Sequence, residues 1–251
     1  MGWLHEGHRA LIRTARAESA TVVVSIFVNP RQFGEAADFT KYPRSEARDL
    51  AICDEEGVDF VFAPSVEEVY PPGFDTSVSV GAVARPLEGA ARPGHFDGVA
   101  TVVAILFSLV EAERAWFGQK DAQQVMVIRQ MARDLAIGTE VVALPTVREP
   151  DGLALSSRNV HLTPEQRTAA PVLHRALLAA HSAWERGERS GDALRAAMRD
   201  VLATEPLAEP DYVSIADGST LAELDLVDGP ALASLAVRFG ETRLIDNVPL
   251  G

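Results

Sequence analysis

The first part of the chain alternates between runs with a helical period and short, continuously apolar runs. In the helical runs, apolar residues recur every three or four positions, which places them on one face of a helix. The apolar runs are rich in β-branched residues, as is typical of strands covered on both faces of a parallel sheet. The predicted helices lie at 9–17, 45–56, 98–111 and 122–135, and the predicted strands at 21–28, 59–63, 115–117 and 140–145.

This alternation predicts an α/β fold with a Rossmann-like open parallel sheet, in which ligands bind outside the carboxyl ends of the strands. Such a sheet should open with a strand that feeds the first helix, but the sequence begins at a turn, so the first strand is expected to be missing. Met1 is then an internal start, the chain is shortened, or the sheet lacks a central strand. Residues 33–42 are polar and residues 64–93 are rich in Gly and Pro, which predicts two loops, the second with short strands.

The pattern changes near residue 146, where a polar stretch is followed by Thr163-Pro164-Glu165-Gln166. A threonine N-cap with proline at the first helical position is typical of a helix start. We therefore predict two domains, residues 1–146 and residues 147–251, of which the second is a smaller α+β domain. The elements predicted for it are alanine-rich helices at about 164–185 and 190–204 and an antiparallel sheet with strands at 212–216, 231–239 and 243–247.

Composition narrows the class of protein. The chain has 251 residues, of which 47% are hydrophobic, enough for a substantial core. Its formal net charge of −13 argues against nonspecific binding of nucleic acid, although a few placed cations can still hold an anionic nucleotide. The single cysteine, Cys53, excludes a disulfide framework and a cysteine-based zinc cluster. Neither a signal peptide nor a long apolar span is found, so we expect a cytoplasmic protein.

The first candidate site is the stretch from Gly2 to His8. His5 and His8 are three residues apart, so on a helix both imidazoles share one face. A helix start presents backbone N–H groups and a partial positive charge, which suit phosphate, and glycine lets phosphate oxygens approach the backbone. We interpret the stretch as a site for a nucleotide triphosphate. A surface histidine pair is the alternative, because an H-x-x-H match alone is weak.

Two later clusters carry complementary chemistry. At residues 118–121 a strand ends in Gly118, and Lys120 can neutralise phosphate charge while Asp121 accepts from ribose hydroxyls or caps a helix. At residues 155–159 two hydroxyls and the Arg158 guanidinium can fold over a triphosphate and stabilise a departing pyrophosphate. Taken alone, each cluster also fits an ordinary helix terminus or a surface loop.

The three clusters belong to a set of stretches that extends over nearly the whole chain. These stretches are Met1-Gly2, His5-Glu6-Gly7-His8, Phe27-Val28-Asn29-Pro30, Gln32-Phe33, Tyr42-Pro43-Arg44, Arg92-Pro93, His95-Phe96, Gly98-Val99, Phe117-Gly118, Lys120-Asp121, Gln123-Gln124, Pro145-Thr146-Val147-Arg148-Glu149, Asp151-Gly152-Leu153-Ala154 and Ser156-Ser157-Arg158-Asn159. Together they resemble the pantothenate synthetase (pantoate–β-alanine ligase) family of the HIGH-type nucleotidyltransferases.

The resemblance implies a ligase that uses ATP and Mg²⁺ to join pantoate to β-alanine through a pantoyl-adenylate intermediate, releasing AMP and pyrophosphate. It also implies a homodimer, whose contact the apolar helix at 98–111 could supply if that helix is not simply part of the core. Two alternatives remain at this point. The chain could be another nucleotidyltransferase of the superfamily, or an inactive nucleotide-binding relic that has lost its first strand.

The resemblance also implies roles for individual residues. The catalytic group comprises His5, His8, Lys120 and Arg158, with His8 matching the residue assigned as proton donor. Gln32 and Gln124 match amides that hold pantoate, Val99 and Val102 match residues beside its gem-dimethyl group, and Gln32 also matches a contact to β-alanine. The residues that match ATP contacts are Met1, Gly2, His5, His8, Gly118, Lys120, Asp121, Val147, Leu155, Ser156, Ser157 and Arg158. No residue matches a metal ligand.

Overall fold

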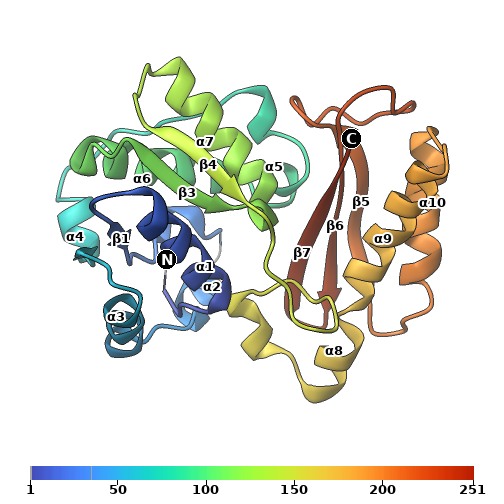
Figure 1. The fold of residues 1–251 in the computed structure, drawn as a ribbon, viewed down its shortest axis with the longest axis horizontal. Coiled ribbons are helices and arrows are strands. Elements are labelled where there is room, and N and C mark those ends of the chain that lie inside the picture. Colours follow the sequence, from blue (N-terminus) through green and yellow to red (C-terminus); the bar gives the residue numbers. More distant parts are fainter. Residues whose placement is uncertain (1, 35) are drawn as a thin grey trace. The chain divides into compact units, whose positions relative to one another are not determined.

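The computed structural model describes residues 2–34 and 36–251 and divides them into two compact units (Figure 1). Unit 1 comprises the residues up to Gln119 together with Gln123–Pro145, and unit 2 comprises Lys120–Ala122 together with Thr146–Gly251. The short segment Lys120–Ala122 therefore makes its contacts with the second unit, although it lies in the first part of the sequence. The predicted division into domains of residues 1–146 and 147–251 stays a prediction.

Unit 1 has the predicted α/β character. Strands β1 and β2 pair in parallel, with Val24 opposite Val61, and β3 and β4 pair in parallel, with Gly118 opposite Leu144. The parallel strands thus form two separate pairs, and no strand within the described residues joins them. The elements are α1 (Glu6–Glu18), β1 (Val23–Ser25), η1 (Pro30–Gln32), α2 (Ala36–Lys41), α3 (Glu46–Glu55), β2 (Phe60–Phe62), α4 (Val66–Val69), η2 (Ala82–Ala84), α5 (Glu88–Ala91), α6 (His95–Val110), β3 (Arg114–Gly118), α7 (Ala122–Asp134) and β4 (Glu140–Leu144).

The prediction of two loops in unit 1 is wrong in part. The stretch 33–42 contains helix α2, and the stretch 64–93 contains α4, η2 and α5 and no strand. Local capping explains α4: the Ser65 side chain accepts from the Glu68 backbone, and the Glu68 carboxylate accepts from the Ser65 backbone. Such single turns are too short to produce a hydrophobic period, so the sequence pattern did not indicate them.

A small apolar cluster holds the start of unit 1 together. Leu4 and the inner face of α1 pack against β1 and α3, and Trp116 of β3 covers the same cluster. Helix α6 is buried along its first three turns, while Leu109 near its end is exposed. Burial of each large apolar side chain contributes about 1.5–3 kcal/mol, so this cluster fixes where α1 begins relative to β1 and β3.

Unit 2 is the predicted α+β arrangement. Its sheet is antiparallel in the order β5-β6-β7, and helices α9 and α10 pack against it and against each other (Figure 1). The single helix predicted at 164–185 is instead two helices, because Pro171 has no N–H group to continue the first one. The elements are η3 (Gln119–Asp121), η4 (Ser157–His161), α8 (Pro164–Ala169), α9 (Val172–Glu185), α10 (Gly191–Leu202), β5 (Glu209–Asp217), β6 (Ala231–Phe239) and β7 (Thr242–Leu250).

Not one of the described helices combines the length and the apolar character that a membrane-spanning segment needs.

Candidate active site

The two histidines of the first candidate site cap helix α1. His5 is the N-cap, and its Nδ1 accepts from the Gly7 backbone N–H at 3.2 Å. The His8 Nδ1 accepts from the His5 backbone N–H, also at 3.2 Å, and the two ring centroids are 4.1 Å apart. Because each Nδ1 is an acceptor, the proton of each neutral ring lies on Nε2. The pair therefore offers two Nε2–H donors beside the positive end of a helix, as a phosphate site requires.

A buried carboxylate holds the turn that leads into α1. Asp49 of α3 is 1% exposed, and its two oxygens accept from the Trp3 and Leu4 backbone N–H groups, both at 2.7 Å. Trp3 has a positive φ of 55°, an unusual value for a side chain of this size, and the Arg48 guanidinium lies 4.8 Å from its ring centroid. Sequence reasoning did not single out Asp49. The signal was an acidic residue on the apolar face of the predicted helix 45–56, one turn before Ile52 and Cys53.

Two glycines predicted to contact ATP differ in their surroundings. Gly2 is buried, and a side chain there would press on Val28. Gly118 ends β3, which α1 packs against, and a Cβ at this position would meet no described atom within 4 Å. Packing within the protein therefore does not explain the glycine at 118, and the open space there suits the predicted approach of a ligand. Met1, also a predicted contact, lies outside the described residues.

The Lys120 turn belongs to unit 2. The Lys120 ammonium lies 3.7 Å from an Asp121 carboxylate oxygen, and the lysine side chain is mostly buried while the aspartate is half exposed. A largely buried ammonium whose ion pair among the described residues is this single distant oxygen can still attract phosphate oxygens. Asp121 lies in η3, immediately before α7, where it both complements the helix dipole and keeps an exposed acceptor.

The predicted adenine contacts and the predicted serine–arginine cluster lie on one hairpin and the turn after it. The Leu155 backbone N–H donates to the Val147 carbonyl at 3.0 Å, so the two predicted adenine contacts are direct neighbours. Ser156 then caps η4 by accepting from the Arg158 backbone N–H at 3.2 Å, and Ser157 is buried. The predicted cluster of two hydroxyls and a guanidinium is therefore a single ordered turn of unit 2.

The predicted pantoate residue Gln32 lies in η1 of unit 1, against the start of α6. Its backbone carbonyl accepts from the Arg92 guanidinium at 3.1 Å and lies 2.8 Å from the His95 Nδ1, which must therefore carry the proton. A side chain at Gly98 would overlap the Arg31 carbonyl, so α6 and η1 are in backbone contact. This contact places the Gln32 backbone N beside Gly98, the residue before Val99.

A buried asparagine fixes the shape of the same turn. The Asn29 Nδ2 donates to the Gly98 carbonyl at 3.0 Å and to the Gln32 Oε1 at 3.3 Å. Its Oδ1 accepts from the Tyr70 hydroxyl at 2.8 Å. Burial raises the pKa of Tyr70 to about 12, so this hydroxyl stays a donor at any physiological pH. With its Oε1 engaged, the Gln32 amide is oriented.

The remaining predicted pantoate residues are Gln124 on α7 and two valines on α6. Gln124 on α7 is half buried and its amide has no hydrogen-bond partner among the described residues, as suits a ligand contact. Its neighbour Gln123 is instead structural, since it bonds the Glu88 N–H and the Val83 and Pro86 carbonyls. Val99 and Val102 are buried on α6. No described hydrogen bond joins Gln124 to Gln32.

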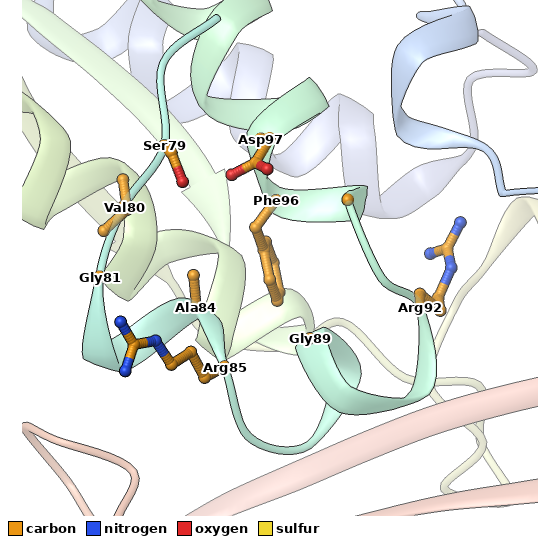
Figure 2. A pocket seen from close by; sticks show the side chains of 10 residues that line it. Ser79, Val80, Gly81, Ala84, Arg85, Gly89, Arg92, Phe96 and Asp97 are labelled. Atoms are coloured by element: carbon orange, nitrogen blue, oxygen red, sulfur yellow. The ribbon is translucent and has the colours of Figure 1, made fainter.

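Unit 1 also contains a cavity of about 360 Å³ that none of the predicted contacts lines. Figure 2 shows Ser79 and Asp97 facing each other at one end, while the Arg85 and Arg92 side chains extend to opposite sides. Two guanidinium groups that point apart do not form a clamp for an anion. We therefore assign this cavity no part in the reaction.

The match to a family model covers residues 1–249 and is to the pantoate-beta-alanine ligase family. The pantothenate synthetase of Roseiflexus castenholzii is 63% identical, over 98% of this chain and 89% of its own. That of Chloroflexus aggregans is also 63% identical, over 98% and 90%. A crystal structure of pantothenate synthetase from Thermus thermophilus is 53% identical, with a TM-score of 0.96 over 99% of this chain and 90% of that one.

A fourth relative is known with ligands. The pantoate-beta-alanine ligase of Francisella tularensis, described as complexed with beta-gamma ATP and beta-alanine, is 35% identical, with a TM-score of 0.80 over 99% of this chain and 86% of that one. These matches define an enzyme of the ligase class that forms a C–N bond. The chain belongs to the pantoate–β-alanine ligase family, as the resemblance predicted. The matches support this interpretation and not the two alternatives.

Proposed function

We propose that this chain condenses pantoate with β-alanine at the expense of ATP and that the turns described above hold the reactants. The observation that carries the proposal is the family match over residues 1–249. The histidine cap of α1 supports it chemically, because its Nε2–H donors suit phosphate oxygens. The two halves of the reaction, activation of an acid and attack by an amine, need different groups.

In the first half, a pantoate carboxylate oxygen attacks the α-phosphorus of ATP and the bond to the β-phosphate oxygen breaks. Pyrophosphate leaves with that electron pair, and pantoyl adenylate is formed. His5 and His8 donate to the phosphates, and Lys120 and Arg158 stabilise the charge that moves onto the leaving group. Gly2 and Gly118 leave room for the phosphates, Asp121 accepts from the ribose, and the Val147–Leu155 hairpin meets adenine through its backbone.

In the second half, the β-alanine amine attacks the acyl carbon of the adenylate, and the bond to the AMP oxygen breaks. AMP leaves, the attacking nitrogen loses a proton and the amide of pantothenate remains. Gln32 and Gln124 hold pantoate, Val99 and Val102 lie against its methyl groups, and Gln32 also contacts β-alanine. Positioning supplies most of the rate enhancement, since no covalent enzyme intermediate is needed.

Magnesium is expected to enter with ATP. The described residues contain no group of three His, Cys, Asp or Glu side chains that could hold a metal ion. Mg²⁺ commonly binds through substrate phosphates and water with one or two carboxylates, so the site fits an ion carried by the nucleotide. When bound, the ion neutralises phosphate charge. We assign it no protein ligand.

We further propose a cytoplasmic homodimer that acts on small molecules and binds neither nucleic acid nor membranes. The net charge of −13 supports the expected lack of nonspecific nucleic-acid binding. Light scattering after size exclusion should give twice the 27.0 kDa of one chain, and a value for a single chain would contradict the dimer.

Pyrophosphate exchange tests the function itself. Labelled pyrophosphate should enter ATP only when pantoate is present, without β-alanine, and pantothenate and AMP should appear once β-alanine is added. Exchange that is independent of pantoate would favour another nucleotidyltransferase, and nucleotide binding without either reaction would favour an inactive protein. Both outcomes would contradict the proposal.

A further inference from the structure

Strand β7 is bonded to the Lys120 turn. The Asn247 Nδ2 donates to the Lys120 backbone carbonyl at 2.9 Å, although the two residues are 127 positions apart. Asn247 is 5% exposed, so its amide is shielded from water, while the bond as a whole is partly buried. A hydrogen bond from a buried donor orients its partners strongly, because the donor cannot exchange it for a bond to solvent at low cost.

The asparagine is itself held by a buried ion pair. The Arg148 guanidinium donates to both oxygens of Asp246, at 2.6 and 2.9 Å, and the Asp246 side chain is 1% exposed. Asp246 also accepts from the Asn247 backbone N–H at 2.8 Å, and Arg148 donates to the Gly152 carbonyl at 3.1 Å. The network therefore ties β7 both to Lys120 and to the hairpin that carries Val147 and Leu155.

Stability alone does not account for such an ion pair. Replacement of a buried ion pair by well-packed apolar side chains is often neutral or stabilising, because desolvation offsets the attraction. A satisfied buried network does, however, fix geometry. Here it fixes the backbone of a residue proposed to contact phosphate. The same strand packs against η4, which contains Ser157 and Arg158.

We propose that Asn247, held by Asp246 and Arg148, is a positioning residue for Lys120. By fixing the Lys120 carbonyl it sets the direction of the backbone in η3, and hence where the ammonium lies when ATP is bound. Asn247 does not touch the substrate in this account. The inference rests on the proposed function, because it takes the contact between Lys120 and phosphate as given.

A double-mutant cycle tests the inference. In the 251-residue chain, Asn247→Ala should lower kcat for pantoate-dependent pyrophosphate exchange about 30-fold, since displacement of a catalytic group by about 1 Å can cost 10²-fold. The KM for pantoate should stay within about twofold, because the pantoate residues lie elsewhere. In the Lys120→Ala background the same change should cost less than about threefold, because the group that it positions is gone.

Two further variants complete the design. Asn247→Ser shortens the side chain but keeps it polar, and should reproduce the kinetic effect if Asn247→Ala is poorly folded. Asp211→Asn is the matched control. It removes the ion pair between Asp211 of β5 and Arg243 of β7, the strand that carries Asn247, without touching the Lys120 turn. It should leave kcat unchanged.

The outcomes separate this inference from the proposed function. Equal losses in the wild-type and Lys120→Ala backgrounds, a change in thermal stability alone, or failure of both Asn247 variants to fold would overturn the positioning role. If the wild-type chain makes no pantothenate, or if Lys120→Ala retains full activity, the proposed function itself is contradicted. Normal wild-type chemistry with full activity in Asn247→Ala contradicts only the inference.

Discussion

The start of α1 and the Lys120 turn both present hydrogen-bond donors at the beginning of a helix, but different parts of the chain support them. At α1, the histidine rings cap the helix through hydrogen bonds that span only two or three residues. At the Lys120 turn, the backbone is held by Asn247 from a strand near the end of the sequence. The histidine capping is local, although Asp49 of α3 holds the turn before it, whereas the Lys120 turn depends on the sheet of unit 2.

The largest expected effect comes from removing the donors themselves. His8→Ala or Lys120→Ala should lower kcat for pyrophosphate exchange about 10²–10³-fold, the range found when one donor to a developing charge is lost. The melting temperature should change little for Lys120→Ala and fall modestly for His8→Ala, because His8 also accepts from the His5 backbone N–H at the start of α1. Lys41→Ala is the matched control for the loss of one lysine and should retain full activity. A small kinetic effect with a large thermal one would contradict the assigned roles.

The next effect tests how local the support of α1 is. Asp49→Asn should destabilise the fold by about 1.5–3 kcal/mol, because a charged acceptor of two buried backbone N–H groups becomes a neutral amide with one acceptor oxygen. Urea unfolding measures this loss, and pyrophosphate exchange should fall as well. Glu55 lies in α3 like Asp49 and forms an exposed ion pair with Arg9 of α1. Glu55→Gln weakens that pair and should cost far less. Equal losses would mean that the Asp49 bonds have no special role.

A third effect concerns Gly118, where β3 ends before the Lys120 turn. Gly118→Ala should raise the KM for ATP about tenfold, because a methyl group would occupy space that phosphate oxygens approach. The melting temperature should stay the same or rise slightly, since the Cβ meets no described atom. An unchanged KM for ATP would remove Gly118 from the proposed contacts.

The smallest effect is a pH dependence in unit 2. Burial lowers the pKa of His174, and the nearby Arg148 guanidinium lowers it further by charge repulsion. The Asp246 carboxylate acts in the opposite direction. The unfolded chain therefore binds a proton at higher pH than the folded chain does, so this residue's contribution to stability is present above the ordinary histidine pKa and is lost as the pH falls below it. His174→Gln should flatten that part of the decline between about pH 7.5 and pH 5 in urea unfolding. An unchanged slope would contradict the lowered pKa.

Local signals explain what the sequence predicted well. Hydrophobic periodicity and β-branched runs located α1, α3, α6, α7 and the seven strands of the described residues within a few residues, because those elements are long or strongly patterned. The capping pattern at Thr163 and Pro164 marked the start of α8 correctly. The H-x-x-H spacing indicated a shared helix face, and the structure confirms that the two rings lie side by side.

Contacts between distant residues explain what the sequence could not predict. Nothing near Asp49 in the sequence indicates that its carboxylate holds Trp3 and Leu4, and nothing near Asn247 indicates a bond to Lys120. Both depend on which segments the completed fold brings together. The roles of the candidate site residues as ligand contacts stay predictions, because a single unliganded chain does not test them.

The assignment of Lys120–Ala122 to unit 2 has a consequence for dissecting the protein. The chain passes between the units after Gln119, again after Ala122 and a third time after Pro145. A fragment that ends at residue 145 would retain the lysine but lose the strand that fixes its carbonyl. Swapping the C-terminal portion between homologous enzymes would likewise exchange the support without the supported turn, so chimeras joined near residue 146 should be matched at both places.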